Sequence, residues 1–125
     1  MADLSKLRAA VIEKQDLILN KLTSLSYEEV MQLMASLSSL ITNLDKVQAE
    51  EEVRCNKLIA GEMERDPRTT FSKAESILKT TEIYLAYKNV MSLKQCTVRG
   101  LNLARLHTQY LLKFKVIDEV PESEL

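Results

Sequence analysis

The sequence predicts an all-α fold: an elongated helical bundle or coiled coil of three to four helices that assembles into a homo-oligomer. The chain has 125 residues, of which 46% are hydrophobic, but only two are glycine and two are proline. Few turns are therefore available, and the elements must be few and long. The apolar residues are mainly Leu, Ala, Met and Ile, which favour helices, and they recur at spacings of three and four. The absence of Trp argues against a β-sandwich.

The first two helices are expected over residues 4–23 and 27–63. The boundary between them is a capping box, in which the Ser26 hydroxyl accepts from the Glu29 amide and the Glu29 side chain accepts from the Ser26 amide. Two acidic residues in the first turn also suit the helix dipole. At about 1.5 Å per residue, a 37-residue second helix is about 55 Å long. This length is more than a compact chain of 125 residues needs, which favours an elongated or oligomeric assembly.

The second helix carries the most regular apolar pattern in the chain, with spacings of 3, 4, 3, 4 and 3. Its members are Val30, Leu33, Leu37, Leu40, Leu44 and Val47. A heptad seam of this kind packs against another helix knobs-into-holes. The partner helix lies either in the same chain or in a second copy, and the pattern fits both arrangements.

Two further helices are expected over residues 70–98 and 101–116. Pro67 ends the second helix, because the residue before a proline is driven out of the α region. Gly100 marks a kink, a turn or a close helix crossing, so the last two helices are separate or form one bent helix. Residues 1–117 then make a single helical domain, and residues 118–125 are expected to form a disordered acidic tail.

The chain lacks the usual signs of an enzyme. It has a single histidine, His107, which is expected to be a buried structural residue among leucines. Cys55 and Cys96 have no companions at metal-ligand spacing, and we expect two reduced thiols. No glycine-rich phosphate loop is present. We therefore expect no catalytic activity, no metal and no cofactor. A membrane-spanning stretch and a signal peptide are also missing from the sequence, which predicts a cytoplasmic protein with no membrane partner.

Charge is segregated along the chain. Residues 68–115 contain nine basic and two acidic residues, a balance of +7, whereas residues 1–67 and 116–125 each carry −4. On one continuous helix, six of these cations fall within roughly 140° of one another. They are Lys73, Lys88, Lys94, Arg99, Arg105 and Lys113. Such a face suits a nucleic-acid backbone, and the nearby Tyr84, Tyr87, Tyr110 and Phe114 offer rings for base stacking. Alternatively, these cations pair with the acidic half of the chain, with an acidic protein or with a small anion.

The second half of the sequence resembles the small recombination mediators of T-even phages, the UvsY family. The resemblance is carried by Ala74, Leu78-Lys79, Tyr84 and Arg99-Gly100, set in a Lys- and Leu-rich helical context. The spacing between Lys79 and Arg99-Gly100 departs from the family pattern, and the first half of the chain does not match it. The resemblance implies an oligomer that binds single-stranded DNA and assists a recombinase or a single-strand-binding protein. It would place the protein in a bacterium or a phage-infected cell.

Two functions follow as hypotheses. The first is a non-enzymatic, oligomeric accessory protein that binds single-stranded DNA or RNA through the six cations. The second is a protein-interaction module, such as an adaptor, a virion component or an inhibitor of a larger complex. Its surface would be the seam Val30–Val47 or the acidic run Glu50–Glu52.

Overall fold

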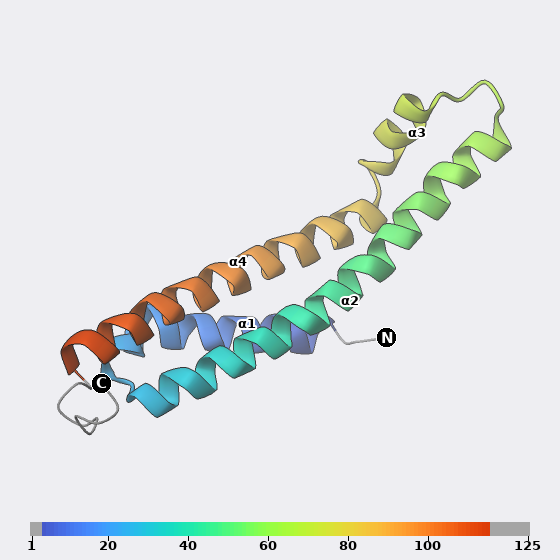
Figure 1. Cartoon of the computed structure of the whole chain (residues 1–125). Helices are drawn as coiled ribbons and strands as arrows, with labels where there is room; N and C mark the ends of the chain where they lie inside the picture. Colours follow the sequence, from blue (N-terminus) through green and yellow to red (C-terminus); the bar gives the residue numbers. More distant parts are fainter. Residues whose placement is uncertain (1–3, 116–125) are drawn as a thin grey trace.

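The computed structural model describes residues 4–115, which form four α-helices, short π- and 3₁₀-helical segments and no strand. The α-helices are α1 (Leu4–Asp16), α2 (Tyr27–Arg65), α3 (Phe71–Leu78) and α4 (Glu82–Tyr110). The long helices α2 and α4 run antiparallel, side by side, as Figure 1 shows. α1 packs against α4 and the first half of α2, and α3 packs against α2 near the opposite end of the molecule. The predicted all-α, elongated bundle is confirmed.

The connection between α1 and α2 follows the predicted boundary closely. α1 continues into a π-helical turn, Leu17–Lys21, and a 3₁₀ turn, Leu22–Ser24, so the first helical segment ends one residue beyond the expected position. The predicted capping box is confirmed at the start of α2. The Glu29 amide donates to the Ser26 hydroxyl at 3.2 Å, and the Ser26 amide donates to a Glu29 carboxylate oxygen at 3.0 Å. Both backbone donors, which the helix itself leaves unpaired, are thus satisfied.

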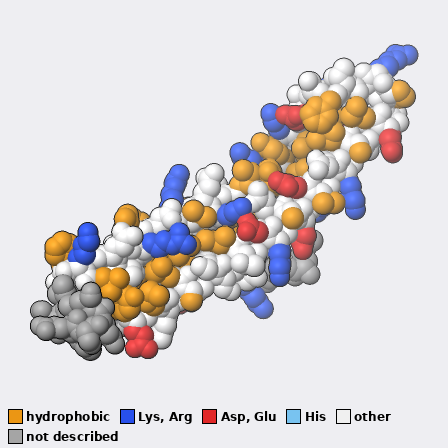
Figure 2. Space-filling model, viewed as in Figure 1, with side chains coloured by type: hydrophobic (Ala, Val, Ile, Leu, Met, Phe, Trp, Pro, Cys, Tyr) orange, Lys and Arg blue, Asp and Glu red, His pale blue; other side chains and the backbone are white. Residues whose placement is uncertain are grey.

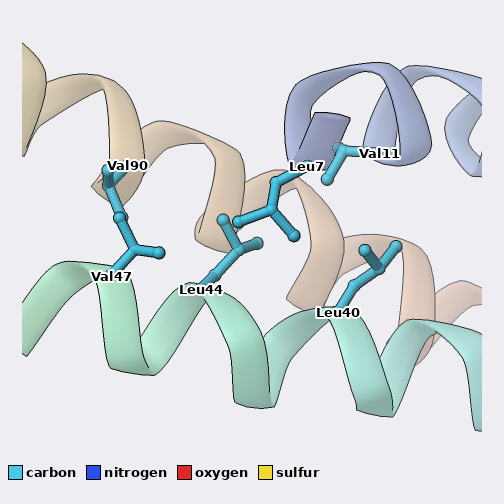
Figure 3. Close-up of a cluster of buried hydrophobic side chains, with 6 residues drawn as sticks. All are labelled: Leu7, Val11, Leu40, Leu44, Val47 and Val90. Atoms are coloured by element: carbon cyan, nitrogen blue, oxygen red, sulfur yellow. The ribbon is translucent and has the colours of Figure 1, made fainter. Parts of the chain in front are cut away.

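The core lies where α1, α2 and α4 meet. Its central cluster contains residues of all three helices, drawn in Figure 3: Leu7, Val11, Leu40, Leu44, Val47 and Val90. A second cluster joins Ile18 and Leu101 to α2, and a third joins Ala104 and Leu111 to α2. The short side chains on α4 allow its backbone to approach α2 and α1 closely.

The predicted helix over residues 70–98 is wrong, because the chain turns between α3 and α4. The amides of Thr80 and Thr81 donate to the carbonyls of Ile77 and Leu78, which closes α3. The Thr81 hydroxyl then accepts from the Tyr84 amide and caps α4. Threonine is a favoured N-cap residue, so Thr81 followed by Glu82 was the local signal for this second start. α3 is capped by Thr70, whose hydroxyl accepts from the Lys73 amide at 3.2 Å.

At Gly100 the sequence left open separate helices or a single helix, and the structure has a single helix, so no separate helix begins at residue 101. α4 runs through Gly100 without interruption and is followed by a π-helical turn, Leu111–Lys115. Gly100 is buried, and a Cβ atom added there would lie 2.7 Å from Cδ1 of Ile18. Of the three expected roles, the close helix crossing is therefore the one observed. The acidic stretch expected over residues 118–125 lies outside the described residues.

Candidate nucleic-acid interface

The continuity of α4 decides how the predicted cations are arranged. Lys88, Lys94, Arg99 and Arg105 lie on this single helix, and Lys113 follows in the π-helical turn. At about 100° per residue, the five share a face roughly 140° wide. The only acidic residue of α4 is Glu82 at its start. The prediction that Lys73 belongs to the same face is wrong, because Lys73 lies on α3, beyond the turn at Thr80 and Thr81.

One of the five cations is already neutralised within the chain. The Lys94 ammonium lies 2.6 Å from a carboxylate oxygen of Asp45 on α2, and it donates to the Gln48 side-chain oxygen at 3.3 Å. The remaining cations of the predicted set are exposed, and no carboxylate of the described residues lies within 4.0 Å of them: Lys73, Lys88, Arg99, Arg105 and Lys113. Pairing with the acidic half of the chain therefore accounts for Lys94 alone within residues 4–115.

Exposed apolar side chains lie beside these cations on the last four turns of the chain's described part. Leu103, Leu106, Tyr110 and Phe114 are spaced by three, four and four residues, so they form one row. Leu106 is 61% exposed and Phe114 is 69% exposed. The Tyr110 ring lies 5.3 Å from the Phe114 ring and 5.9 Å from the imidazole of His107. Figure 2 shows Lys and Arg side chains along α4 between patches of hydrophobic surface.

The sequence analysis considered Tyr110 and Phe114 for base stacking but did not identify this exposed apolar row. The apolar pattern of α4 covers more than one face, and hydrophobicity alone does not say which face is buried. Residue size distinguishes the buried face of α4 from its exposed face. The buried face of α4 carries small or β-branched residues: Val90, Thr97, Gly100, Ala104 and Thr108, with Leu101.

The predicted oligomer or partner seam is contained within the chain. All six of its residues are buried in the three clusters between α2, α1 and α4: Val30, Leu33, Leu37, Leu40, Leu44 and Val47. A second copy could reach these side chains only if the bundle opened. Of the two arrangements that the seam allows, the structure has the one within a single chain.

The acidic run Glu50–Glu52, the other candidate partner surface, is exposed at Glu50 and Glu52 but buried at Glu51. The Glu51 side chain is 8% exposed, and its carboxylate pairs with the Arg54 guanidinium at 3.2 Å. Glu52 is exposed and accepts a hydrogen bond from the Tyr87 hydroxyl at 3.2 Å. The run therefore combines an internal ion pair of Glu51 with a contact between α2 and α4, while Glu50 and Glu52 remain exposed.

The single histidine and the two cysteines do not form a metal-binding site among the described residues. His107 is half-buried, and its Nε2 atom is buried without a hydrogen-bond partner among the described residues. Cys55 and Cys96 are free thiols. Residues 4–115 contain no group of three or more His, Cys, Asp or Glu side chains placed to hold a metal ion. In the same part of the chain, no helix is long and apolar enough to span a bilayer.

Comparisons with protein-family models, with curated proteins and with solved structures found no match to this chain. The function has to be inferred from the surface that the chain itself presents.

Proposed function

We propose that this protein is a non-enzymatic accessory protein that binds single-stranded nucleic acid through the exposed face of α4. One observation carries the proposal. Lys88, Arg99, Arg105 and Lys113 share one face of one helical segment, are exposed, and have no carboxylate of the described residues within 4.0 Å. A chain with a net charge of −1 thus keeps four cations in a row without neutralising them. Phosphates are the natural counter-ions for such a row.

The spacing of the row suits an extended polyanion. Lys88 and Lys113 are 25 residues apart, which corresponds to about 37 Å along a helix. Neighbouring cations are separated by about 9–17 Å along the axis, so a flexible single strand can bring one phosphate to each. Four phosphate contacts predict a salt dependence with a slope of about −2.8 in a plot of log K against log salt concentration.

The exposed rings favour a single strand over a duplex. Tyr110 and Phe114 lie on the same last turns as Lys113, at the end of α4 and in the π turn, and Phe114 is 69% exposed. Unpaired bases stack on such rings, whereas the bases of a duplex are already stacked on one another. Each base–ring stack is worth about 1–3 kcal/mol. Tyr84 and Tyr87 are half-buried and hold a different place, near α3.

The resemblance to the phage recombination mediators adds a context to this proposal. Of the residues that carry it, Arg99 lies on the exposed face of α4 and Gly100 at the crossing with Ile18. In that context the protein would act in the cytoplasm of a bacterium or a phage-infected cell, bind single-stranded DNA and assist a recombinase or a single-strand-binding protein.

A second candidate function is a protein-interaction module that self-associates. It is favoured by the row Leu103, Leu106, Tyr110 and Phe114, which continues over three turns at spacings that suit helix–helix packing. In this version the surface of the homo-oligomer is the exposed row of α4 and not the buried seam of α2. Sedimentation of the native chain and of Leu106→Glu tests it: the variant remains monomeric where the native chain associates. Identical masses for the two folded proteins count against self-association through this row.

The nucleic-acid proposal is tested by a double charge reversal. Arg99→Glu with Arg105→Glu should lower the affinity for a labelled single-stranded oligonucleotide at least tenfold at low salt, since two phosphate contacts become repulsive. The matched control is Lys46→Glu with Lys57→Glu on α2, which changes the net charge equally at two exposed positions. If both folded variants lose affinity to the same extent, binding depends on net charge and not on the α4 face. Unchanged binding by the α4 variant would rule the proposal out.

A further inference from the structure

A pocket of about 450 Å³ lies between α2, α3 and the start of α4. Six of its lining residues define its chemistry: Glu52, Cys55, Phe71, Glu75, Tyr84 and Tyr87. α3 and the start of α4 lie at the opposite end of the molecule from the C-terminal turns of α4, as Figure 1 shows, so the pocket is separate from Arg105 and Lys113. Its volume falls in the range of sites for small organic ligands, about 300–1,000 Å³.

Three aromatic rings from two helices line this pocket. The centroids of Tyr84 and Tyr87 lie 6.4 Å apart, with their planes inclined at 38°, so α4 presents two adjacent rings. Phe71, at the start of α3, is 57% exposed and supplies the third. The Phe71 ring therefore borders the pocket with much of its surface open to solvent. The Lys88 ammonium lies 6.0 Å from the Tyr84 ring centre but lines the neighbouring pocket, not this one.

The polar groups of the pocket are mainly acidic. Glu52 and Glu75 face one cation, Lys79, whose ammonium already lies 3.5 Å from Glu75. Burial and then the hydrogen bond to Glu52 raise the pKa of Tyr87, so the phenol remains a neutral donor that positions the Glu52 carboxylate. Burial, followed by the charge of Glu51, raises the pKa of the Cys55 thiol, which therefore contributes an uncharged surface. The excess charge of the pocket is negative.

From this combination we propose that the pocket binds an organic cation with a methylated ammonium group, held against the rings of Phe71, Tyr84 and Tyr87 and beside the carboxylate of Glu52. The negative faces of aromatic rings attract such a cation, and ring clusters are used elsewhere in proteins to recognise choline and methylated lysine. An anion would meet Glu52 and Glu75. A neutral apolar ligand would leave the Glu52 carboxylate desolvated without compensation. This binding activity is additional to the proposed nucleic-acid function and does not depend on it.

The test uses choline and its neutral isostere 3,3-dimethylbutan-1-ol, in which carbon replaces the ammonium nitrogen. Amide shifts of the isotope-labelled full-length chain are followed by NMR as each compound is added. Choline should shift amides of α3 and of the start of α4, with an affinity about three- to thirtyfold higher than that of the alcohol. Absence of shifts with choline, or equal affinities for the two compounds, would overturn the proposal.

Two variants assign the binding to this pocket. Phe71→Ala removes an exposed ring and leaves the core unchanged, so the chain should fold and bind choline several-fold more weakly. Its matched control is Phe114→Ala, the same change at an exposed ring of the other end, which should leave choline binding unaltered. Glu52→Gln keeps an acceptor for the Tyr87 hydroxyl but removes the charge, so the preference for choline over the alcohol should shrink. An undiminished preference in Glu52→Gln, together with native affinity in Phe71→Ala, would show that choline binds elsewhere.

Discussion

The two long helices use their apolar residues in opposite ways. α2 buries all six residues of its heptad seam, while Met31, Val53 and Met63 on its other faces are exposed. α4 buries small and β-branched residues, such as Thr97, Gly100 and Ala104, and leaves Leu103, Leu106, Tyr110 and Phe114 on the outer side of its last turns and the π turn that follows. The regular apolar pattern of α2 therefore marks residues that stabilise the fold. In α4, the buried face carries mainly small and β-branched residues, and the large apolar residues of its last turns are exposed.

The largest expected effect on stability comes from removing a buried side chain of α2. Leu44 is fully buried at the centre of the main cluster, so Leu44→Ala removes contacts and leaves a cavity. The free energy of unfolding should fall by about 2–5 kcal/mol. Leu103→Ala on the exposed side of α4 is the control and should change it by less than about 1 kcal/mol. Urea denaturation of both variants measures the difference. Equal losses would mean that Leu103 contributes to the core as much as Leu44.

The two glycines, Gly61 on α2 and Gly100 on α4, allow the two helices to be compared by substitution. Gly100→Leu places a side chain where Ile18 already lies, and the overpacking should destabilise the protein by about 1–3 kcal/mol. Gly61, on α2, has open space around it, since a Cβ atom added there would meet nothing within 4 Å. Gly61→Leu should therefore stabilise the protein by about 0.5–1 kcal/mol through helix propensity. Thermal unfolding followed by circular dichroism checks both signs, and a stabilising Gly100→Leu would contradict the close crossing.

A smaller effect concerns the one neutralised cation of α4. Asp45→Asn removes the carboxylate that pairs with Lys94, a partly exposed ion pair whose loss should cost less than about 1 kcal/mol of stability. The freed ammonium should strengthen oligonucleotide binding several-fold at low salt and steepen the salt slope by about 0.7. Glu64→Gln, at an exposed position of α2, gives the same change in net charge as a control. If both variants gain affinity equally, Lys94 has no particular share in binding.

The smallest expected effect is a pH dependence at the start of α2. The Ser26 backbone amide and then the Ser26 side chain lower the pKa of Glu29. A carboxylate with a lowered pKa in the folded state stabilises that state above its unfolded pKa, about 4.3. This contribution is lost as the pH falls through the lower, folded-state pKa. The stability of Glu29→Gln should therefore fall less steeply than that of the native chain in this range, as measured by urea denaturation at successive pH values. Parallel profiles would mean that the capping box has no electrostatic component.

The sequence predicted the structure best where a feature depends only on residues close together in the chain. The capping box of Ser26 and Glu29 and the heptad seam of α2 depend on neighbours within a few residues, and both are present as predicted. The break before α4 was missed because Thr80 and Thr81 are tolerated inside helices as well as at their caps. Gly100 was ambiguous because its role depends on Ile18, which lies 82 positions away in the sequence. For the candidate interface, the sequence indicated a basic C-terminal stretch, but it could not show that Lys73 lies on a separate helix or that Asp45 neutralises Lys94.

The central claim is that the exposed face of α4 binds a phosphate backbone. Fluorescence anisotropy of a labelled single-stranded oligonucleotide, titrated with the native chain across a series of salt concentrations, tests it most directly. We expect binding at low salt and a loss of affinity with a slope of about −2.8 in log K against log salt concentration, as four phosphate contacts require. Absence of binding at low salt, or an affinity that does not respond to salt, would contradict the account.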